Sequence, residues 1–307
     1  MTQEPVRKVL LATDGSKEAR YAAGMARELC EALGAELHIV YVRSVPEAYI
    51  NQWSMAEPEF IDEIFEQAAQ DARRKAEEEA AKIGEAGGTV AGVHAAVGRA
   101  DAEIVRLAEE LEAGIVVVGS RGLGAVRRAL MGSVSMSVVR HARGSVLVVR
   151  GEPGDGAYFP GRILAAVDGS KEADAALRMA AGISAATGSE LHLLYALDVT
   201  PKPPYPHPLA GERWEHYLEE AKRKARSFVE EKAEQVRAEG TDVAVAKVAF
   251  GRPDREIVEE AEELGASLIV TGSRGLGGVR RALMGSVSDS VVRHAHCPVL
   301  VVRGQAV

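Results

Sequence analysis

Residues 119–134 read GSRGLGAVRRALMGSV, and residues 272–287 read GSRGLGGVRRALMGSV, so the chain contains one phrase twice. The two copies differ only at Ala125 and Gly278. Each copy follows a strand-like apolar run, IVVVG or LIVTG, and precedes a helix-like run and a second apolar run, VLVVR. A glycine-rich loop between a strand and a helix lets backbone N–H groups approach a phosphate closely. Two near-identical loops therefore predict two copies of one site.

The repeat extends over the whole chain. RKVLLATDGSKEA, which starts at Arg7, returns as GRILAAVDGSKEA, which starts at Gly161. GAELHIVYV and GRADAEIV likewise return as GSELHLLYA and GRPDREIV. A repeat this long indicates two tandem domains rather than a short-period solenoid. We place the first domain at 1–150, a linker rich in glycine and proline at 151–161, and the second domain at 162–307.

Strand-like and helix-like segments alternate within each half. In the first half we expect strands near 7–13, 36–42, 90–97, 114–119 and 145–150, and helices near 16–33, 58–86, 101–112 and 132–142. Alternation of this kind predicts a parallel sheet with right-handed crossovers. Ligands of such sheets bind beyond the carboxyl ends of the strands. Because Asp14 and Gly119 both lie at such ends, we expect them to meet at one site.

Composition narrows the class of protein. The net charge of −8 argues against a nucleic-acid-binding surface. No apolar run approaches the roughly 18 residues that a membrane helix needs, and the N-terminal segment does not resemble a signal peptide. The two cysteines, Cys30 and Cys297, fall in different halves, so we expect no disulfide framework and a cytoplasmic location.

The glycine spacing carries a family resemblance. Gly119 and Gly122 are followed, after nine residues, by Gly132 and Ser133, and the second half repeats this spacing. Together with an Asp that closes the first strand, the pattern resembles the nucleotide-binding type of universal stress protein, in a tandem form that covers both halves. The resemblance implies two flavodoxin-like (adenine nucleotide alpha hydrolase-like) domains. Each would have a five-stranded parallel sheet in order 3-2-1-4-5, helices on both faces and a bound ATP.

Carried over position by position, the resemblance implies one ATP site per domain. The implied contact residues of the first site are Ala12, Asp14, Val42, Val118, Gly119, Arg121, Gly122, Gly132, Ser133 and Val134. Those of the second site are Ala166, Asp168, Ala196, Thr271, Gly272, Arg274, Gly275, Gly285, Ser286 and Val287. In this resemblance Asp14 and Asp168 lie near the ribose or a Mg²⁺ carried by the phosphates. Val42 and Ala196 flank the adenine.

The chemistry of the loop agrees with a phosphate ligand. Gly122 lacks a Cβ where the backbone has to pass close to an anion, and Gly132–Ser133 opens a helix whose first N–H groups favour negative charge. Arg127 and Arg128, repeated as Arg280 and Arg281, would offset phosphate charge or else lie on the solvated surface. A turn with no ligand remains the alternative reading of the glycines.

The sequence lacks the motifs of several enzyme classes. It contains no G-x-x-x-x-G-K-[ST] loop, no G-x-G-x-x-G fingerprint after a first strand, no zinc spacing and no G-x-S-x-G elbow. Three functions stay open: an ATP-binding regulator of the stress response, a slow ATPase that acts as a timer, and an interaction protein with a structural nucleotide. AMP and cyclic AMP are alternatives to ATP. We expect a binder rather than an enzyme, because no residue is evident that would orient an attacking water.

Partners follow from the strand pattern and the resemblance. The VLVVR runs at 146–150 and 299–303 are expected to be the edge strands of their sheets, and the resemblance implies antiparallel pairing between them. A homodimer of tandem chains and a regulatory protein partner are expected, with no nucleic acid and no membrane. The segment PKPPYPHP at 201–208 is expected to be a stiff loop, with or without a role at the nucleotide.

Overall fold

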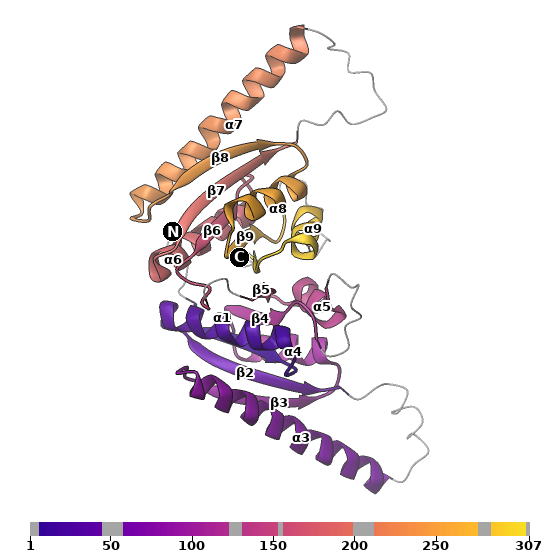
Figure 1. Cartoon of the computed structure of the whole chain (residues 1–307). Coiled ribbons are helices and arrows are strands. Elements are labelled where there is room, and N and C mark those ends of the chain that lie inside the picture. The colour runs from indigo at the N-terminus through magenta and orange to yellow at the C-terminus, as the bar shows by residue number, and fades with distance from the viewer. Residues whose placement is uncertain are drawn as a thin grey trace. The chain divides into compact units, whose positions relative to one another are not determined.

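The computed structural model of the chain divides into two compact units, with the boundary between Tyr158 and Phe159 (Figure 1). The structure describes residues 6–44, 58–122, 131–152, 156–198, 212–275 and 284–304. Arg127, Arg128, Arg280, Arg281 and the proline-rich segment 201–208 lie outside the described residues.

The first unit is a parallel sheet built by strands and helices that alternate along the chain. Its elements are β1 (Lys8–Thr13), α1 (Lys17–Leu33), β2 (Glu36–Arg43), α3 (Pro58–Glu85), β3 (Gly92–Val97), α4 (Ala100–Glu110), β4 (Ile115–Gly119), α5 (Ser133–His141) and β5 (Ser145–Val149). The strand order is β3-β2-β1-β4-β5, and the neighbouring strands are parallel. β4 is buried along its whole length, as its unbroken apolar run predicts.

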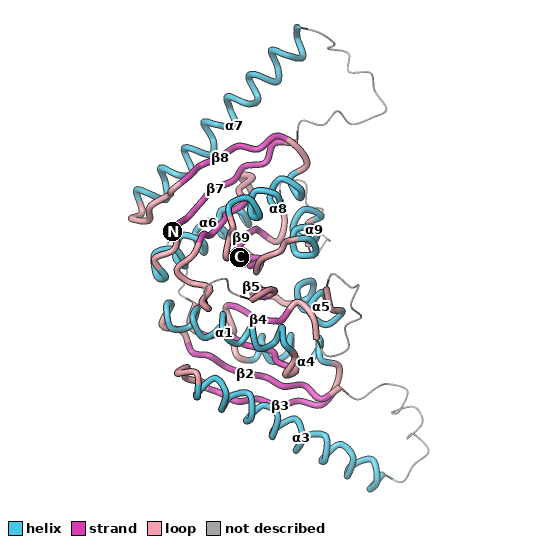
Figure 2. The backbone as a smooth tube through the Cα atoms, viewed as in Figure 1, coloured by secondary structure: helices cyan, strands magenta, loops and turns pink. Residues whose placement is uncertain are grey.

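The second unit repeats this topology. Its elements are β6 (Arg162–Ala166), α6 (Lys171–Thr187), β7 (Glu190–Leu197), α7 (Glu212–Ala238), β8 (Val245–Phe250), α8 (Pro253–Leu264), β9 (Leu268–Gly272), α9 (Ser286–His294) and β10 (Val299–Val302). Its strands follow the order β8-β7-β6-β9-β10 with parallel pairings. Both units thus have the predicted order 3-2-1-4-5 with helices around a sheet (Figure 2), so the predicted fold class is confirmed.

The outer strands agree with the sequence in part. β5 and β10 are each the last strand of their own sheet, as expected for the two VLVVR runs. Pairing between these two edges stays a prediction. In the first unit α3 runs along β2 and β3, and in the second α7 runs along β7 and β8 (Figure 1). Among the helices of the described segments, none is long and apolar enough to cross a membrane.

Helix α1 shows how the sequence sets the geometry near the end of β1. The Ser16 hydroxyl accepts a hydrogen bond from the backbone N–H of Ala19 at 3.2 Å and caps the helix. The buried face consists of Ala19, Ala22, Met25, Ala26, Leu29 and Cys30. The apolar stripe in the sequence also includes Ala23 and Leu33, which are only half-buried, whereas Met25 takes a core position. The small side chains let α1 approach the sheet closely, so its first turn lies beside the end of β4.

Candidate functional site

The first component of the site is a tight turn after the first strand of each unit. The Asp14 carboxylate accepts a hydrogen bond from the backbone N–H of Ser16 at 3.0 Å, and Asp168 does the same for Ser170 at 2.9 Å. Gly15, between Asp14 and Ser16, has a φ of 75°, in the left-handed region that favours glycine. Each turn therefore holds its Asp side chain at the carboxyl end of the sheet. The sequence predicted this position.

The glycine-rich loop meets this turn in both units. The Ser16 hydroxyl donates to the backbone carbonyl of Arg121 at 3.4 Å, and Ser170 donates to that of Arg274 at 3.3 Å. A Cβ at Gly122 would collide with the Asp14 carboxylate, and one at Gly275 would collide with Asp168. The structure thus brings the aspartate and the loop together across about a hundred residues of sequence, as predicted. Contact with the aspartate thus explains why glycine is needed at these two positions even without a ligand, which the sequence alone did not show.

Gly119 and Gly272 have a different structural role. A Cβ on Gly119 would lie 2.9 Å from the backbone carbonyl carbon of Glu18, and one on Gly272 would lie 2.8 Å from the backbone nitrogen of Ala173. Real side chains essentially never approach backbone so closely. These glycines therefore let β4 end directly against the first turn of α1, and β9 against the first turn of α6.

The second component is the N-terminus of α5 and of α9. Gly132 is the N-cap of α5, and its N–H donates to the carbonyl of Ser120 at 2.8 Å. Within the described residues, no side chain caps α5 or α9. Ser133 and Val134 occupy the first turn and are exposed. A helix start of this kind presents backbone N–H groups and the positive end of its dipole to the solvent.

Gly132 differs from the other loop glycines. The nearest atom to a Cβ on Gly132 would be the carbonyl oxygen of Ser120 at 3.5 Å, which is an ordinary contact. At Gly285 the nearest atom is the Cα of Arg274 at 3.4 Å. The described parts of the protein would therefore accommodate a methyl group at Gly132, so the fold alone does not require glycine there.

Hydroxyl groups that the sequence did not single out fix these helices to the strands. Ser135 donates to the carbonyl of Gly119 at 2.6 Å, and Ser288 donates to that of Gly272 at 2.6 Å. Both serines are buried. Their spacing after the G-S pair is the same in both copies, which is the signal that was available in the sequence.

The loop arginines are paired with carboxylates. Arg121 lies 2.8 Å from Glu18, and Arg274 lies 3.1 Å from Glu172. Both glutamates belong to the repeated SKEA segment, but sequence reasoning did not connect them with the loop. Burial and the nearby Arg274 lower the pKa of Arg303, which places a second guanidinium in the same region of the second unit. Arg121 and Arg274 thus lie at the loop with at least part of their charge already compensated.

The remaining predicted contact residues lie on the strands. Ala12 is flanked in the sheet by Val40 and Val118, and Ala166 pairs with Leu194. Val42 and Ala196 are half-buried near the ends of β2 and β7, while Thr271 is buried in β9. These residues therefore lie toward the carboxyl ends of their strands, on the same side of the sheet as the aspartates.

The two sites differ beneath the Asp-Gly-Ser turn. In the first unit the carboxylate of buried Glu79 lies 3.7 Å from the Cβ position of Gly15 and pairs with Lys82 at 2.5 Å. In the second unit the ring of Phe228 occupies the corresponding place, 3.5 Å from the Cβ position of Gly169. Phe228 packs edge-on against Tyr195, with ring centroids 5.1 Å apart. Burial and the charge of Asp168 raise the pKa of Tyr195. The tyrosine was not predicted from the sequence.

Metal ligation by the protein alone finds no support in the described segments, which contain no group of three or more His, Cys, Asp or Glu side chains arranged to hold an ion. His294 Nδ1 lies 2.8 Å from the carbonyl of Ser290 at the end of α9, and His296 pairs with Glu262. Both histidines thus make contacts within the protein, one at the last turn of α9 and one just after it.

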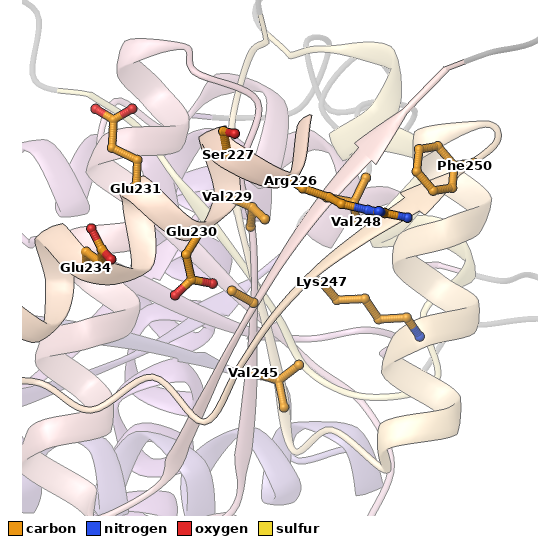
Figure 3. Close-up of a pocket in the computed structure, with 11 residues that line it drawn as sticks. Arg226, Ser227, Val229, Glu230, Glu231, Glu234, Val245, Lys247, Val248 and Phe250 are labelled. Atoms are coloured by element: carbon orange, nitrogen blue, oxygen red, sulfur yellow. The ribbon is translucent and has the colours of Figure 1, made fainter. Parts of the chain in front are cut away.

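A groove of about 770 Å³ lies elsewhere in the second unit, between α7 and β8 (Figure 3). Arg226, Glu230 and Glu234 line it from the helix, and Val245 and Lys247 line it from the strand. None of its lining residues belongs to the cluster around Asp168 and the glycine-rich loop. The repeated loops, rather than this groove, are therefore the candidate site.

Comparison with known proteins identifies related sequences and folds. The model of the universal stress protein family matches residues 5–150 and again residues 160–303. A universal stress protein of Mycolicibacterium smegmatis is 36% identical over 193 residues, which cover 62% of this chain and 61% of the relative. One of Mycobacterium bovis is 35% identical over 196 residues, which cover 62% and 58%. The chain thus matches about three fifths of the length of these relatives. A universal stress protein structure from Archaeoglobus fulgidus DSM 4304 superimposes with a TM-score of 0.67 at 26% identity, over 96% of both chains.

Proposed function

Because the chain belongs to the universal stress protein family, with one family domain in each half, we propose that each domain binds one ATP and that the protein is a nucleotide-dependent regulator of the stress response. The proposed sites are the two clusters formed by the Asp-Gly-Ser turn, the glycine-rich loop and the start of α5 or α9. The chain acts in the cytoplasm as a homodimer with a regulatory protein partner in this proposal.

The observation that carries the proposal is the uncapped, glycine-led start of α5 and α9. A Cβ at Gly132 or Gly285 would make only ordinary contacts, at 3.5 Å and 3.4 Å, with the described residues. These contacts do not require glycine, whereas a ligand that approaches the backbone would. An anion at this position would accept hydrogen bonds from the N–H groups of the first turn. The exposed Ser133 and Ser286 hydroxyls would add one donor each.

The other residues take roles that fit a nucleoside triphosphate. Asp14 and Asp168 would contact the ribose or a Mg²⁺ that arrives with the phosphates, since the described residues contain no group of three or more His, Cys, Asp or Glu side chains that could hold the ion by itself. Val42 and Ala196 would flank the adenine. Arg121 and Arg274 would offset phosphate charge, in competition with Glu18 and Glu172.

Binding rather than turnover is proposed as the main activity. Phosphoryl transfer needs a nucleophile held in line with the phosphate and a group that orients it. In the part of the chain that the structure describes, the cluster offers hydrogen-bond donors and the strand-end Asp, and Glu18 and Glu172 are paired with the loop arginines. No paired base lies beside the helix start in these segments. A slow ATPase that acts as a timer is the alternative, and turnover separates it from the regulator.

The test begins with the nucleotide that the purified protein carries. Denaturation followed by chromatography should release adenine nucleotide, and calorimetric titration of stripped protein with ATP should give a stoichiometry near two. AMP and cyclic AMP, titrated in parallel, establish which nucleotide binds most tightly. Gly122→Glu should abolish one site and Gly275→Glu the other, by steric collision and charge repulsion with the aspartate and the phosphates. Normal ATP binding in the double variant would contradict the proposed location.

A further inference from the structure

A hydroxyl–carboxylate contact joins α5 to the start of α4, and the second unit repeats it. Ser137 Oγ donates to Asp101 Oδ2 at 2.6 Å, and Ser290 Oγ donates to Asp254 Oδ2 at 2.8 Å. The two aspartates belong to the repeated segments GRADAEIV and GRPDREIV, to which the proposed nucleotide sites assign no role. Because the contact recurs in both units at the same separation in sequence, we regard it as a structural feature of the domain rather than a chance surface pair.

The carboxylate in this contact is ionised, and it also pairs with an arginine that lies two residues earlier in the sequence. Arg99 lies 3.1 Å from Asp101, and Arg252 lies 3.0 Å from Asp254. The Ser137 hydroxyl and Arg99 hold the pKa of Asp101 below its usual value. Burial alone would raise the pKa of Asp254, but its hydrogen bonds to Ser290 and Arg252 lower it. The serine therefore donates to an ionised acceptor, which is stronger than a neutral one.

The serine is also fixed within its helix. His141 Nδ1 lies 2.8 Å from the carbonyl of Ser137 and 3.2 Å from its hydroxyl, and His294 repeats both contacts with Ser290. Since a carbonyl oxygen only accepts, Nδ1 carries the proton in this arrangement. The histidine side chain thereby bonds back to its own helix one turn earlier, near the end of the nine-residue α5.

Two serines clamp α5 from nearly opposite sides. Ser135 bonds to the end of β4, and Ser137 bonds to the start of α4. Residues two apart in an α-helix are rotated by about 200°, so the two hydroxyls leave the helix in different directions. A helix this short is marginally stable on its own, and its position depends on such contacts.

We propose that Asp101 and Asp254 are positioning residues for the phosphate-facing ends of α5 and α9, acting through Ser137 and Ser290. The inference rests on the proposed ATP sites. The clamp fixes where the N–H groups of the first helical turn lie relative to the Asp-Gly-Ser turn, and those N–H groups are the proposed phosphate ligands. Loss of the clamp leaves the nucleoside end of each site unchanged and weakens the hold on the phosphates.

The experiment compares ATP with adenosine in the full chain, with the second site disabled by Gly275→Glu. Ser137→Ala and Asp101→Ala should each weaken ATP binding by about threefold to tenfold, the range expected for one lost hydrogen bond. Adenosine affinity should change by less than about twofold, because adenosine does not reach the helix end. Ser137→Thr, which keeps the hydroxyl, should restore ATP affinity. The Asp101→Ala, Ser137→Ala double variant should lose no more than either single variant.

Controls separate positioning from general damage. Ser290→Ala in the same background should leave the first site unaffected, and it should weaken the second site when Gly122→Glu disables the first instead. Equal loss of ATP and adenosine binding in Ser137→Ala would assign the contact to stability alone and overturn the positioning role. Unchanged ATP affinity would also overturn it. A parent chain that binds no nucleotide would instead overturn the proposed function, and the positioning role would fall with it.

Discussion

At the scale of single residues, the loop glycines are present for different reasons. Gly119 and Gly122 are required by contacts inside the protein, with the backbone of Glu18 and with the Asp14 carboxylate. Gly132 has no such contact in the described structure. A motif that reads as one phosphate-binding signature therefore combines residues that build the loop with a residue whose space is left for a ligand.

This distinction predicts the effect of adding one methyl group. Gly132→Ala should change the free energy of unfolding by less than about 1 kcal/mol, since the position is an N-cap with room for a Cβ. It should nevertheless weaken ATP binding at the first site. Gly122→Ala should both displace Asp14 and weaken binding. Urea unfolding and calorimetry on the two variants check this, and unimpaired ATP binding in Gly132→Ala would place the phosphates elsewhere.

A second residue-scale prediction concerns pH. His38 Nδ1 lies 3.1 Å from His94 Nε2, and Glu36 lies 3.4 Å from His38 Nε2. Burial and the neighbouring His38 lower the pKa of His94 from 6.5. Below pH 6.5 the unfolded chain binds a proton that the folded protein disfavours, so stability falls as pH drops from 6.5 toward the lowered pKa.

His94→Gln removes this group and should flatten that part of the curve. Urea unfolding between pH 5 and pH 8 measures the slope for both proteins. The second unit has Lys247 at the position that corresponds to His94. A slope that survives in His94→Gln would assign the pH dependence to other groups.

At the scale of elements, the start of α1 joins stability to the site. Ser16 caps the helix through the N–H of Ala19 and also tethers the loop through the carbonyl of Arg121. Ser170 makes both contacts at α6 in the second unit. One hydroxyl thus acts as an acceptor toward its own helix and as a donor toward a loop that is distant in sequence.

Two substitutions separate these roles. Ser16→Ala should lower the free energy of unfolding by about 1 kcal/mol through loss of the cap, and it should also weaken ATP binding at the first site. Ser16→Asp keeps a capping acceptor but cannot donate to a carbonyl. It should therefore recover most of the stability without recovering the affinity. Recovery of both would show that the tether to Arg121 does not matter for binding.

At the scale of the whole molecule, the chain contains two copies of one loop, and the side chains packed beneath the adjoining Asp-Gly-Ser turn differ between the two units. Glu79 lies beneath the turn of the first unit, and Phe228 lies beneath that of the second. The proposed phosphate-binding parts are alike in both units, since Ser135 and Ser288 hold the two helices by matching bonds. The described geometry thus supports two sites of the same kind.

Ligand binding at both sites should stabilise the protein without rapid chemistry. ATP at about 100 times its Kd should add about 2.7 kcal/mol of stability per independent site, seen as a rise in melting temperature. Phosphate release should stay far below the roughly 1–100 s⁻¹ typical of kinases. Release in that range, abolished by Asp14→Ala with Asp168→Ala, would show that the protein is an ATPase.

The sequence by itself determined the duplication, the α/β class, the strand order through its family resemblance, and the approximate limits of the strands and helices. It did so because apolar runs, caps and glycines act locally, and because the second copy confirms the register of the first. The meeting of Asp14 with Gly122 was also predictable, since parallel strands bring their carboxyl ends to one edge.

Only the tertiary structure decided which contacts hold the site. The pairs Arg121–Glu18, Ser135–Gly119 and Ser137–Asp101 join segments that are far apart in sequence. Each depends on the direction in which a side chain leaves its helix or loop once the layers have packed. The difference between Glu79 and Phe228 under the two turns has the same origin. Periodicity shows which face of a helix is buried, but not which atom of the neighbouring element that face will meet.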